Sequence, residues 1–208
     1  MKRRNLLMGL GASAAALAIP AMGKSTLESV AKWLPTGKGP RADYFPNYVM
    51  TTHEGKQVRF YDDMMAGKTL LVNFMYTTCE GTCPLSTANL KKVHAEFGDQ
   101  MGKDVHMISI SLKPETDTPE KLAEYVANHK IGKGWTYLTG KPAEIEDLRR
   151  KLGFYDPDPR EDVLKNTHIG IVRIGNEKLD RWTASPILQS PEAIVKTVNT
   201  VRPRGLSA

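Results

Sequence analysis

Two hydrophobic periodicities alternate along this chain and predict an α/β protein. Short apolar runs of strand length occur at residues 69–76, 105–112 and 135–139. Each run is followed by a segment in which apolar residues return every three or four positions between charged ones, which is typical of a helix that covers a sheet. The predicted helices are residues 84–98, a segment that starts at a capping box at 117–120 and ends near 130, residues 142–152, and residues 190–201.

Hairpin signals occur on both sides of this pattern. The polar turn 53–56 contains a glycine, and Gly175-Asn176 is a two-residue turn of the kind that closes a hairpin. The strands beside these turns are residues 48–52 and 57–61 in the first hairpin, and residues 167–174 and 179–183 in the second. This order of elements predicts a thioredoxin-like fold, with a central mixed β-sheet flanked by helices and an added N-terminal hairpin.

The only two cysteines of the chain lie at one predicted strand-to-helix turn. Cys79 and Cys83 follow the apolar strand 69–76, and Pro84 opens the next helix. Unpaired backbone N–H groups and the positive end of the helix dipole stabilise a thiolate at such a turn, and thiolates attack disulfides and bind soft metal ions. A disulfide ring this small constrains the unfolded chain little, so the spacing favours a reactive dithiol or a metal site over a structural disulfide.

The first 23 residues have the layout of an export signal. Three positive charges precede an uncharged run rich in Ala, Gly and Leu, and the pair Arg3-Arg4 resembles a twin-arginine signal. We expect residues 1–23 to be a signal peptide or an uncleaved N-terminal anchor, residues 24–43 a linker, and residues 44–208 the thioredoxin-like domain. The expected location is the periplasm, with attachment to the inner membrane if the segment is retained, and this compartment permits disulfides.

The net charge gives no reason to expect a nucleic-acid partner. The 208-residue chain has a formal net charge of +6, but residues 1–23 contain three basic residues and no acidic one. Without them, 26 of the 29 Lys and Arg residues remain against 23 Asp and Glu, a net charge of +3. So small an excess does not indicate nucleic-acid binding. The remaining length suits one domain with a full hydrophobic core.

A metal held by both sulfurs needs a further ligand, and His168 is the predicted candidate. It lies between the polar loop 156–166 and an apolar strand, in the segment that a thioredoxin-like layout places next to the dithiol. From position alone, a loop histidine bonded to the backbone is the alternative. Two thiolates and one imidazole form a soft, low-coordinate set that suits copper, whereas structural zinc usually takes four protein ligands. Surface or core roles are predicted for the other histidines, which are His53, His94, His106 and His129.

Together these features resemble the SCO1/SenC family, thioredoxin-fold copper chaperones that help to build the binuclear copper centre of cytochrome oxidase. The matching segments are Val72–Pro84 (VNFMYTTCEGTCP), the strand 107–112 with Thr118-Pro119 after it, and a histidine 85 residues past the second cysteine. The resemblance covers roughly residues 45–200. It implies that Cys79, Cys83 and His168 are copper ligands.

Three segments differ from the usual pattern of that family, and the last of them is Gly175-Asn176-Glu177, which replaces a Pro-Asp-Gly turn. Residues 80–82 (Glu-Gly-Thr) stand where the family commonly has Pro-Asp-Val, and Thr167 replaces an Asp before His168. A carboxylate next to Cys79 opposes thiolate formation unless copper or another cation offsets it. The chain is therefore identified as a divergent member.

Three functions are compatible with these residues. The resemblance implies a copper metallochaperone that handles Cu(I), Cu(II) or both, depends on a thiol reductant, and passes copper to a respiratory protein such as a cytochrome oxidase subunit. The alternative is a thiol-disulfide oxidoreductase in which Cys79 attacks and Cys83 resolves. An interaction module with a structural disulfide is the third. The chaperone needs His168 as a copper ligand, whereas the oxidoreductase needs no histidine.

Overall fold

The computed structural model describes residues 39–79, 81–164 and 170–203. The predicted signal, residues 1–23, lies outside these ranges, and so does His168. Within the ranges, no helix has the length and apolar content that crossing a bilayer requires. The N-terminal signal or anchor therefore stays a prediction.

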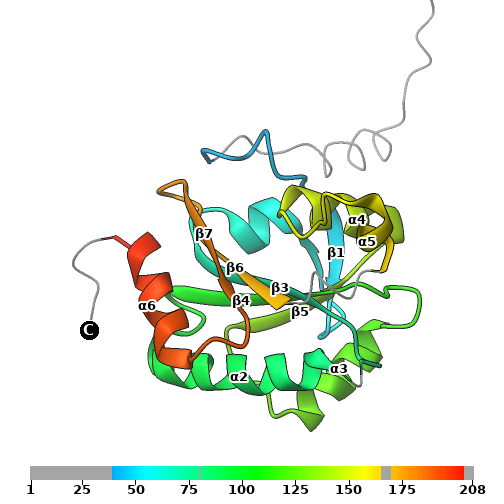
Figure 1. Ribbon diagram of the computed structural model, residues 1–208. Helices are drawn as coiled ribbons and strands as arrows, with labels where there is room; N and C mark the ends of the chain where they lie inside the picture. Colours follow the sequence, from blue (N-terminus) through cyan, green and yellow to red (C-terminus); the bar gives the residue numbers. More distant parts are fainter. Residues whose placement is uncertain (1–38, 80, 165–169, 204–208) are drawn as a thin grey trace, which may run out of the picture. The chain divides into compact units, whose positions relative to one another are not determined.

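A seven-stranded mixed β-sheet forms the centre of the fold (Figure 1). The strands are β1 (Val49–Thr52), β2 (Gln57–Arg59), β3 (Thr69–Met75), β4 (Val105–Ser111), β5 (Trp135–Thr139), β6 (Ile171–Asn176) and β7 (Arg181–Pro186). Their order in the sheet is β2-β1-β5-β4-β3-β6-β7. The three central strands β5, β4 and β3 are parallel, and each edge is an antiparallel hairpin. The central mixed sheet and the added N-terminal hairpin, β1-β2, were both predicted and are confirmed.

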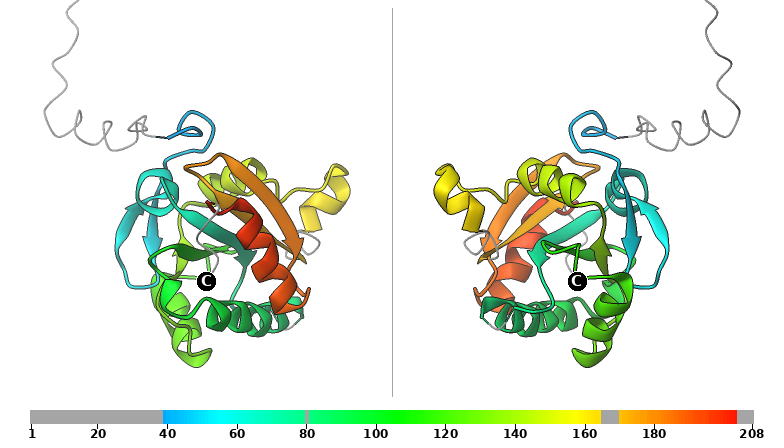
Figure 2. Two further views of the ribbon diagram at one scale, coloured as in Figure 1. Left: turned by 90° about the vertical axis from the view of Figure 1, so that its left-hand side faces the viewer. Right: turned by 90° about the vertical axis from the view of Figure 1, so that its right-hand side faces the viewer.

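Helices cover both faces of this sheet. They are α2 (Thr82–Phe97), α3 (Pro119–Asn128), α4 (Pro142–Lys151), α5 (Pro159–Leu164) and α6 (Pro191–Val201), with a π-helix at Phe60–Met65 and a 3-10 turn at Gly98–Gln100. The crossovers β3-α2-β4 and β4-α3-β5 run in the same direction, which puts α2 and α3 on one face. There α6 packs against α2, while α4 lies on the opposite face (Figures 1 and 2).

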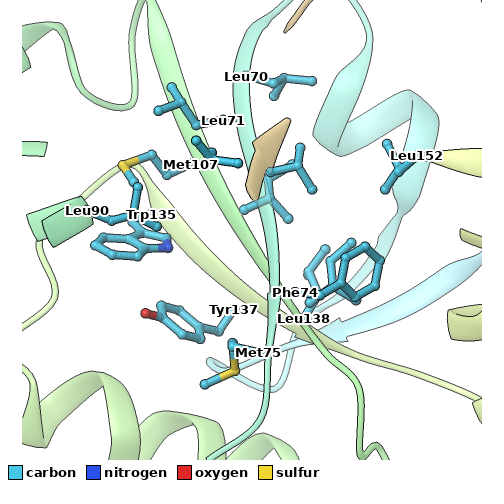
Figure 3. Packing of buried hydrophobic residues seen from close by; sticks show 14 of the residues in the cluster. Leu70, Leu71, Phe74, Met75, Leu90, Met107, Trp135, Tyr137, Leu138 and Leu152 are labelled. Carbon is cyan, nitrogen blue, oxygen red and sulfur yellow. The ribbon is translucent and has the colours of Figure 1, made fainter. Parts of the chain in front are cut away.

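The central strand β3 is buried along its whole length. Its side chains alternate between the two faces: Leu71 and Met75 lie on the side of Leu90 from α2, and Phe74 lies on the side of Leu152, which follows α4 (Figure 3). Each of these five side chains is at most 3% exposed. Burying a side chain of this size contributes about 1.5–3 kcal/mol. Packing on both faces thus fixes the strand that leads to the cysteines.

The second hairpin turns later than the sequence predicts. Gly175 and Asn176 are the last residues of β6, and the turn is formed by residues 177–180. A Cβ at position 175 would collide with the ring of Trp182 on the paired strand, so glycine is needed inside the strand. The Asn176 amide donates to the Thr69 hydroxyl at 2.9 Å, which joins it to β3. The predicted turn at Gly175-Asn176 is therefore wrong.

The strand predicted at residues 57–61 ends at Arg59. The side-chain carbonyl of Asn47 accepts hydrogen bonds from the backbone N–H groups of Tyr61 (3.1 Å) and Asp62 (3.0 Å). These bonds draw the backbone out of the sheet and into the π-helix.

Two helices begin at other residues than predicted. The helix after the cysteines begins at Thr82 instead of Pro84. In the predicted capping box, Thr118 caps α3 by accepting from the Lys121 N–H at 3.4 Å, and Asp117 does not serve as the cap. The side chain of Asp117 has other partners, described below.

The polar loop predicted at residues 156–166 contains the short helix α5. The Asp158 carboxylate accepts from the Arg160 N–H at 2.9 Å, and Pro159 is the first helical residue. A capping acid followed by proline is a helix-start signal, so the prediction of a loop throughout this segment is wrong for residues 159–164.

Candidate metal and dithiol site

The two cysteines share one turn at the carboxyl end of β3, as predicted. Residues 76–81 connect β3 to α2, and Cys83 lies in the first helical turn. Cys79 is half-buried, whereas Cys83 is 1% exposed. The turn thus presents one sulfur towards solvent and holds the other in the core.

Cys79 is the more acidic thiol of the pair. Burial disfavours its thiolate, but hydrogen bonds from the Cys83 thiol, from the backbone N–H groups of Cys83 and Gly81, and from the Tyr76 hydroxyl outweigh burial and lower the pKa of Cys79. The backbone donors lie where the helix begins. The thiolate stabilisation predicted for this turn therefore acts on Cys79.

Cys83 behaves in the opposite way. Burial raises the pKa of the Cys83 thiol to about 12, and its hydrogen bond to Cys79 adds to the effect. The prediction that this turn stabilises a thiolate is wrong for Cys83. Burial of its sulfur disfavours the charged thiolate more strongly than the start of the helix favours it. At neutral pH the pair holds one activated sulfur and one protonated sulfur.

A buried carboxylate holds the start of the dithiol loop in place. Asp117 is fully buried and accepts from the N–H (3.1 Å) and the hydroxyl (2.5 Å) of Thr77, and from the hydroxyl of Ser111 (2.6 Å). Thr77 stands two residues before Cys79, so these bonds fix the path of the loop. The negative charge of Asp117 also contributes, after burial and the bond to Cys79, to the raised pKa of Cys83.

Tyr76 completes the surroundings of Cys79. Its hydrogen bond to the Cys79 sulfur, together with burial, raises the pKa of Tyr76. The Lys113 ammonium lies 4.1 Å from the centroid of the Tyr76 ring, a cation–π contact. Neither Tyr76 nor Asp117 was among the predicted site residues. Tyr76 stands three residues before the first cysteine, which is a usable signal, whereas Asp117 was concealed by the capping-box pattern.

The four histidines in the described part of the chain have other neighbours. His53 and His94 hydrogen-bond to backbone groups, at 3.2 and 2.8 Å. The His129 ring lies 4.1 Å from that of Tyr125. Burial lowers the pKa of His106, which is in β4. All four histidines are partly buried, and the Nδ1 atom of His106 is buried without a hydrogen-bond partner among the described residues.

The two sulfurs alone are an incomplete metal site. Across residues 39–79, 81–164 and 170–203, no three Cys, His, Asp or Glu side chains are grouped as metal ligands. His168, the predicted third ligand, lies outside these ranges. Sulfur donors suit Cu(I). A hydrogen-bonded thiol pair with separated pKa values also suits thiol-disulfide exchange.

A family model described as SCO1/SenC matches residues 36–201. Among curated relatives, the "SCO1 protein homolog" of Bacillus subtilis (strain 168) is 34% identical over 110 residues, which cover 50% of this chain and 53% of the relative. This chain thus spans about half the length of that relative.

Solved structures share the fold at lower identity. The structure of Bradyrhizobium japonicum ScoI with copper bound aligns with a TM-score of 0.57 and 24% identity, over 74% of this chain and 97% of that one. BsSco, described as a member of the Sco family of cytochrome c oxidase assembly proteins with a disulfide switch, aligns with a TM-score of 0.57 and 24% identity, over 74% of this chain and 90% of that one. Both neighbours confirm the thioredoxin-like fold.

Proposed function

The chain belongs to the SCO1/SenC family, and from this we propose that it is a copper metallochaperone that delivers copper to a respiratory copper centre such as that of cytochrome c oxidase. The main support is that the only two cysteines lie at one turn inside the matched range 36–201. Copper bound to B. japonicum ScoI supports copper as the cargo. The description of BsSco as a cytochrome c oxidase assembly protein supports a respiratory receiver.

We assign copper to the sulfurs of Cys79 and Cys83 and the imidazole of His168. The thiolates favour Cu(I), and the imidazole also suits Cu(II). Because the pKa of Cys83 is raised by burial, copper uptake is expected to release its proton. The half-buried position of Cys79 leaves the metal within reach of ligands from a receiving protein. Transfer then proceeds by ligand exchange.

Anaerobic titration of the reduced full-length protein with Cu(I), and separately with Cu(II), tests this assignment. We expect one specific copper site per chain that is lost in Cys79→Ser and Cys83→Ser and weakened in His168→Ala. His129→Ala is the matched control: it also removes an imidazole, but His129 packs against Tyr125 and is not one of the proposed copper ligands. Unchanged affinity in His168→Ala would remove the third ligand, and unchanged affinity in both cysteine variants would refute copper binding by the dithiol.

A thiol-disulfide oxidoreductase is the second candidate, supported by the different pKa values of the two sulfurs. The Cys79 thiolate would attack a target disulfide, form a mixed disulfide and release one target thiolate. Cys83 would then lose its proton and attack the Cys79 sulfur, which releases the second target thiolate. The two electrons come from the dithiol, which ends as a disulfide, and an external thiol reductant must restore it.

Reduction of a copper-protein target or a model disulfide separates the two candidates. An oxidoreductase loses activity in Cys79→Ser and keeps it in His168→Ala. If the protein is a chaperone, His168→Ala weakens copper binding, and the wild-type protein reduces the target disulfide only slowly. Both activities in the wild-type protein would assign both roles to one site in two redox states.

We further propose that the chain acts in the periplasm, after export by residues 1–23. In an oxidising compartment the dithiol needs a thiol reductant before it binds copper. Fractionation of cells that express Arg3→Lys/Arg4→Lys tests export, since a twin-arginine signal requires both arginines. Retention of this variant inside the cell supports the proposal. Unchanged export would assign the segment to another route.

A further inference from the structure

A basic pocket lies on the α4 face of the sheet. It is lined by the cations Arg41, Arg150, Lys151 and Arg173, and no described carboxylate is among its lining residues. Its volume is about 320 Å³, within the range of small-molecule sites. Four like charges around one cavity repel each other unless anions lie close by.

Two of these cations, Arg41 and Arg150, have acidic partners. Arg41 pairs with Asp180 at 2.6 Å, and Arg150 pairs with two acidic side chains outside the cavity. In the part of the chain that the structure describes, no carboxylate lies within ion-pair distance of Lys151 or Arg173. The pocket therefore holds two positive charges that no carboxylate of residues 39–79, 81–164 or 170–203 neutralises.

Arg173 is held firmly against the chain segment that follows α4. Its Nε donates to the Leu152 carbonyl at 2.9 Å, and its Nη2 donates to the Gly153 carbonyl at 3.4 Å. A Cβ at position 153 would collide with Nη2, so glycine makes room for the guanidinium. Burial lowers the pKa of Arg173, which indicates that its charge is partly desolvated. An anionic ligand would offset that cost.

Aromatic rings form the sides of the same cavity. Tyr44 is 46% exposed and Tyr155 is 52% exposed. Trp182 is packed against Phe45, with ring centroids 5.2 Å apart. The Lys151 ammonium lies 5.2 Å from the Tyr44 ring centroid, so cation and ring occupy one wall. Exposed rings beside unpaired cations suit a ligand with a planar body and a negative group.

The basic pocket is separate from the dithiol. Arg173 pairs with Val72 in the middle of β3, whereas Cys79 follows the end of that strand. Cys83 belongs to α2, on the face of the sheet opposite α4 (Figure 1). Occupation of the pocket therefore does not compete with copper for ligands.

We propose that the basic pocket binds a small organic anion, with its carboxylate or phosphate at Lys151 and Arg173 and its planar ring against Tyr44 and Tyr155. The four side chains come from three separate parts of the sequence and line one cavity. Such a site adds ligand binding to a protein whose proposed copper transfer does not require it.

Isothermal titration calorimetry of the full-length protein tests this site with three probes. 2-Naphthoate has a ring and a carboxylate, AMP has a ring system and a phosphate, and 2-naphthalenemethanol has a ring without charge. The variants are Lys151→Met, which removes the cation beside the Tyr44 ring, and Arg173→Gln. Lys196→Met is the matched control, because Lys196 is an exposed lysine on α6, outside the pocket.

We expect one of the two anions to bind and Lys151→Met and Arg173→Gln each to weaken it about tenfold, with wild-type affinity in Lys196→Met. Tighter AMP binding would indicate a phosphate ligand, and tighter 2-naphthoate binding a carboxylate ligand. The proposal is refuted if neither anion binds, if the uncharged probe binds as tightly, or if Lys151→Met binds with unchanged affinity. Unchanged copper binding by Lys151→Met would show that the fold is intact.

Discussion

Hydrogen-bond donors are the main cause of the lowered pKa of Cys79. In the described part of the chain, the groups that lower its pKa are the Cys83 thiol, two backbone N–H groups and the Tyr76 hydroxyl. Lys113 stacks on the ring of Tyr76, the residue that donates to the Cys79 sulfur. Substitution of a donor side chain removes its hydrogen bond, so the effect of that donor on the pKa and reactivity of Cys79 can be measured directly.

Tyr76→Phe should raise the pKa of Cys79, because it removes one donor to the thiolate. A higher pKa leaves less thiolate at pH 7, so alkylation by iodoacetamide should be about fivefold slower there, for a hydrogen bond worth about 1 kcal/mol. The difference should shrink as the pH rises above both pKa values. Rates measured between pH 5 and 10 in a Cys83→Ser background would isolate Cys79. Tyr155→Phe removes an exposed hydroxyl elsewhere and should leave the profile unchanged; equal profiles for Tyr76→Phe and wild type would contradict the prediction.

At the scale of elements, Asp117 connects three of them at the site. Its carboxylate binds Thr77 after β3 and Ser111 at the end of β4, and it immediately precedes the cap of α3. The bonds hold the dithiol loop at the carboxyl end of the parallel strands. A fully buried carboxylate with three donors is expected to matter more for the loop than for α3.

Asp117→Ala should lower the free energy of unfolding by about 3 kcal/mol, since it leaves the donors of half-buried Thr77 and buried Ser111 without this acceptor. Urea denaturation of the reduced protein measures this. Asp43→Ala, which removes an exposed carboxylate, is the control and should change little. A loss no greater than that of the control would mean that Asp117 does not hold the loop.

A buried ion pair joins α4 to α5. The Arg149 side chain is 1% exposed and that of Asp162 is 5% exposed, and both Nη atoms of Arg149 donate to Asp162 at 2.8 Å. Arg149→Met would remove one of the arginines that pair with the buried Asp162 carboxylate, while Arg150 stays within 2.7 Å of it, and we expect a loss of about 3 kcal/mol in the free energy of unfolding. Arg160→Met removes an exposed arginine of the same helix pair and should have little effect. Similar losses in the two variants, measured by urea denaturation, would contradict this account.

Element types were readable from the sequence, but several boundaries were not. The apolar run of β3 and the helical period after Pro84 correctly placed both cysteines at one turn. Gly175 was assigned to a turn because glycine is common in turns. Glycine is also needed inside a strand where the ring of a residue on the paired strand, here Trp182, leaves no room for a Cβ. Asp117 was misread because its partner Thr77 is 40 residues away. Local patterns cannot reveal contacts of that range, and the same limit hid the convergence of cations in the basic pocket.

At the scale of the whole molecule, copper binding and folding should be linked. Unfolding removes the fixed geometry of the turn that holds the two sulfurs, so a metal that binds only the folded dithiol stabilises the protein by about 2.7 kcal/mol when free copper is 100 times the dissociation constant. Anaerobic urea denaturation with buffered Cu(I) should show this gain in the wild-type protein and in Lys196→Met. It should be absent in Cys79→Ser/Cys83→Ser, in which the metal has no sulfur ligand. Equal stabilisation of that double variant would place copper elsewhere on the chain. No stabilisation of the wild type, despite binding, would mean that the unfolded chain holds copper as tightly as the folded one does.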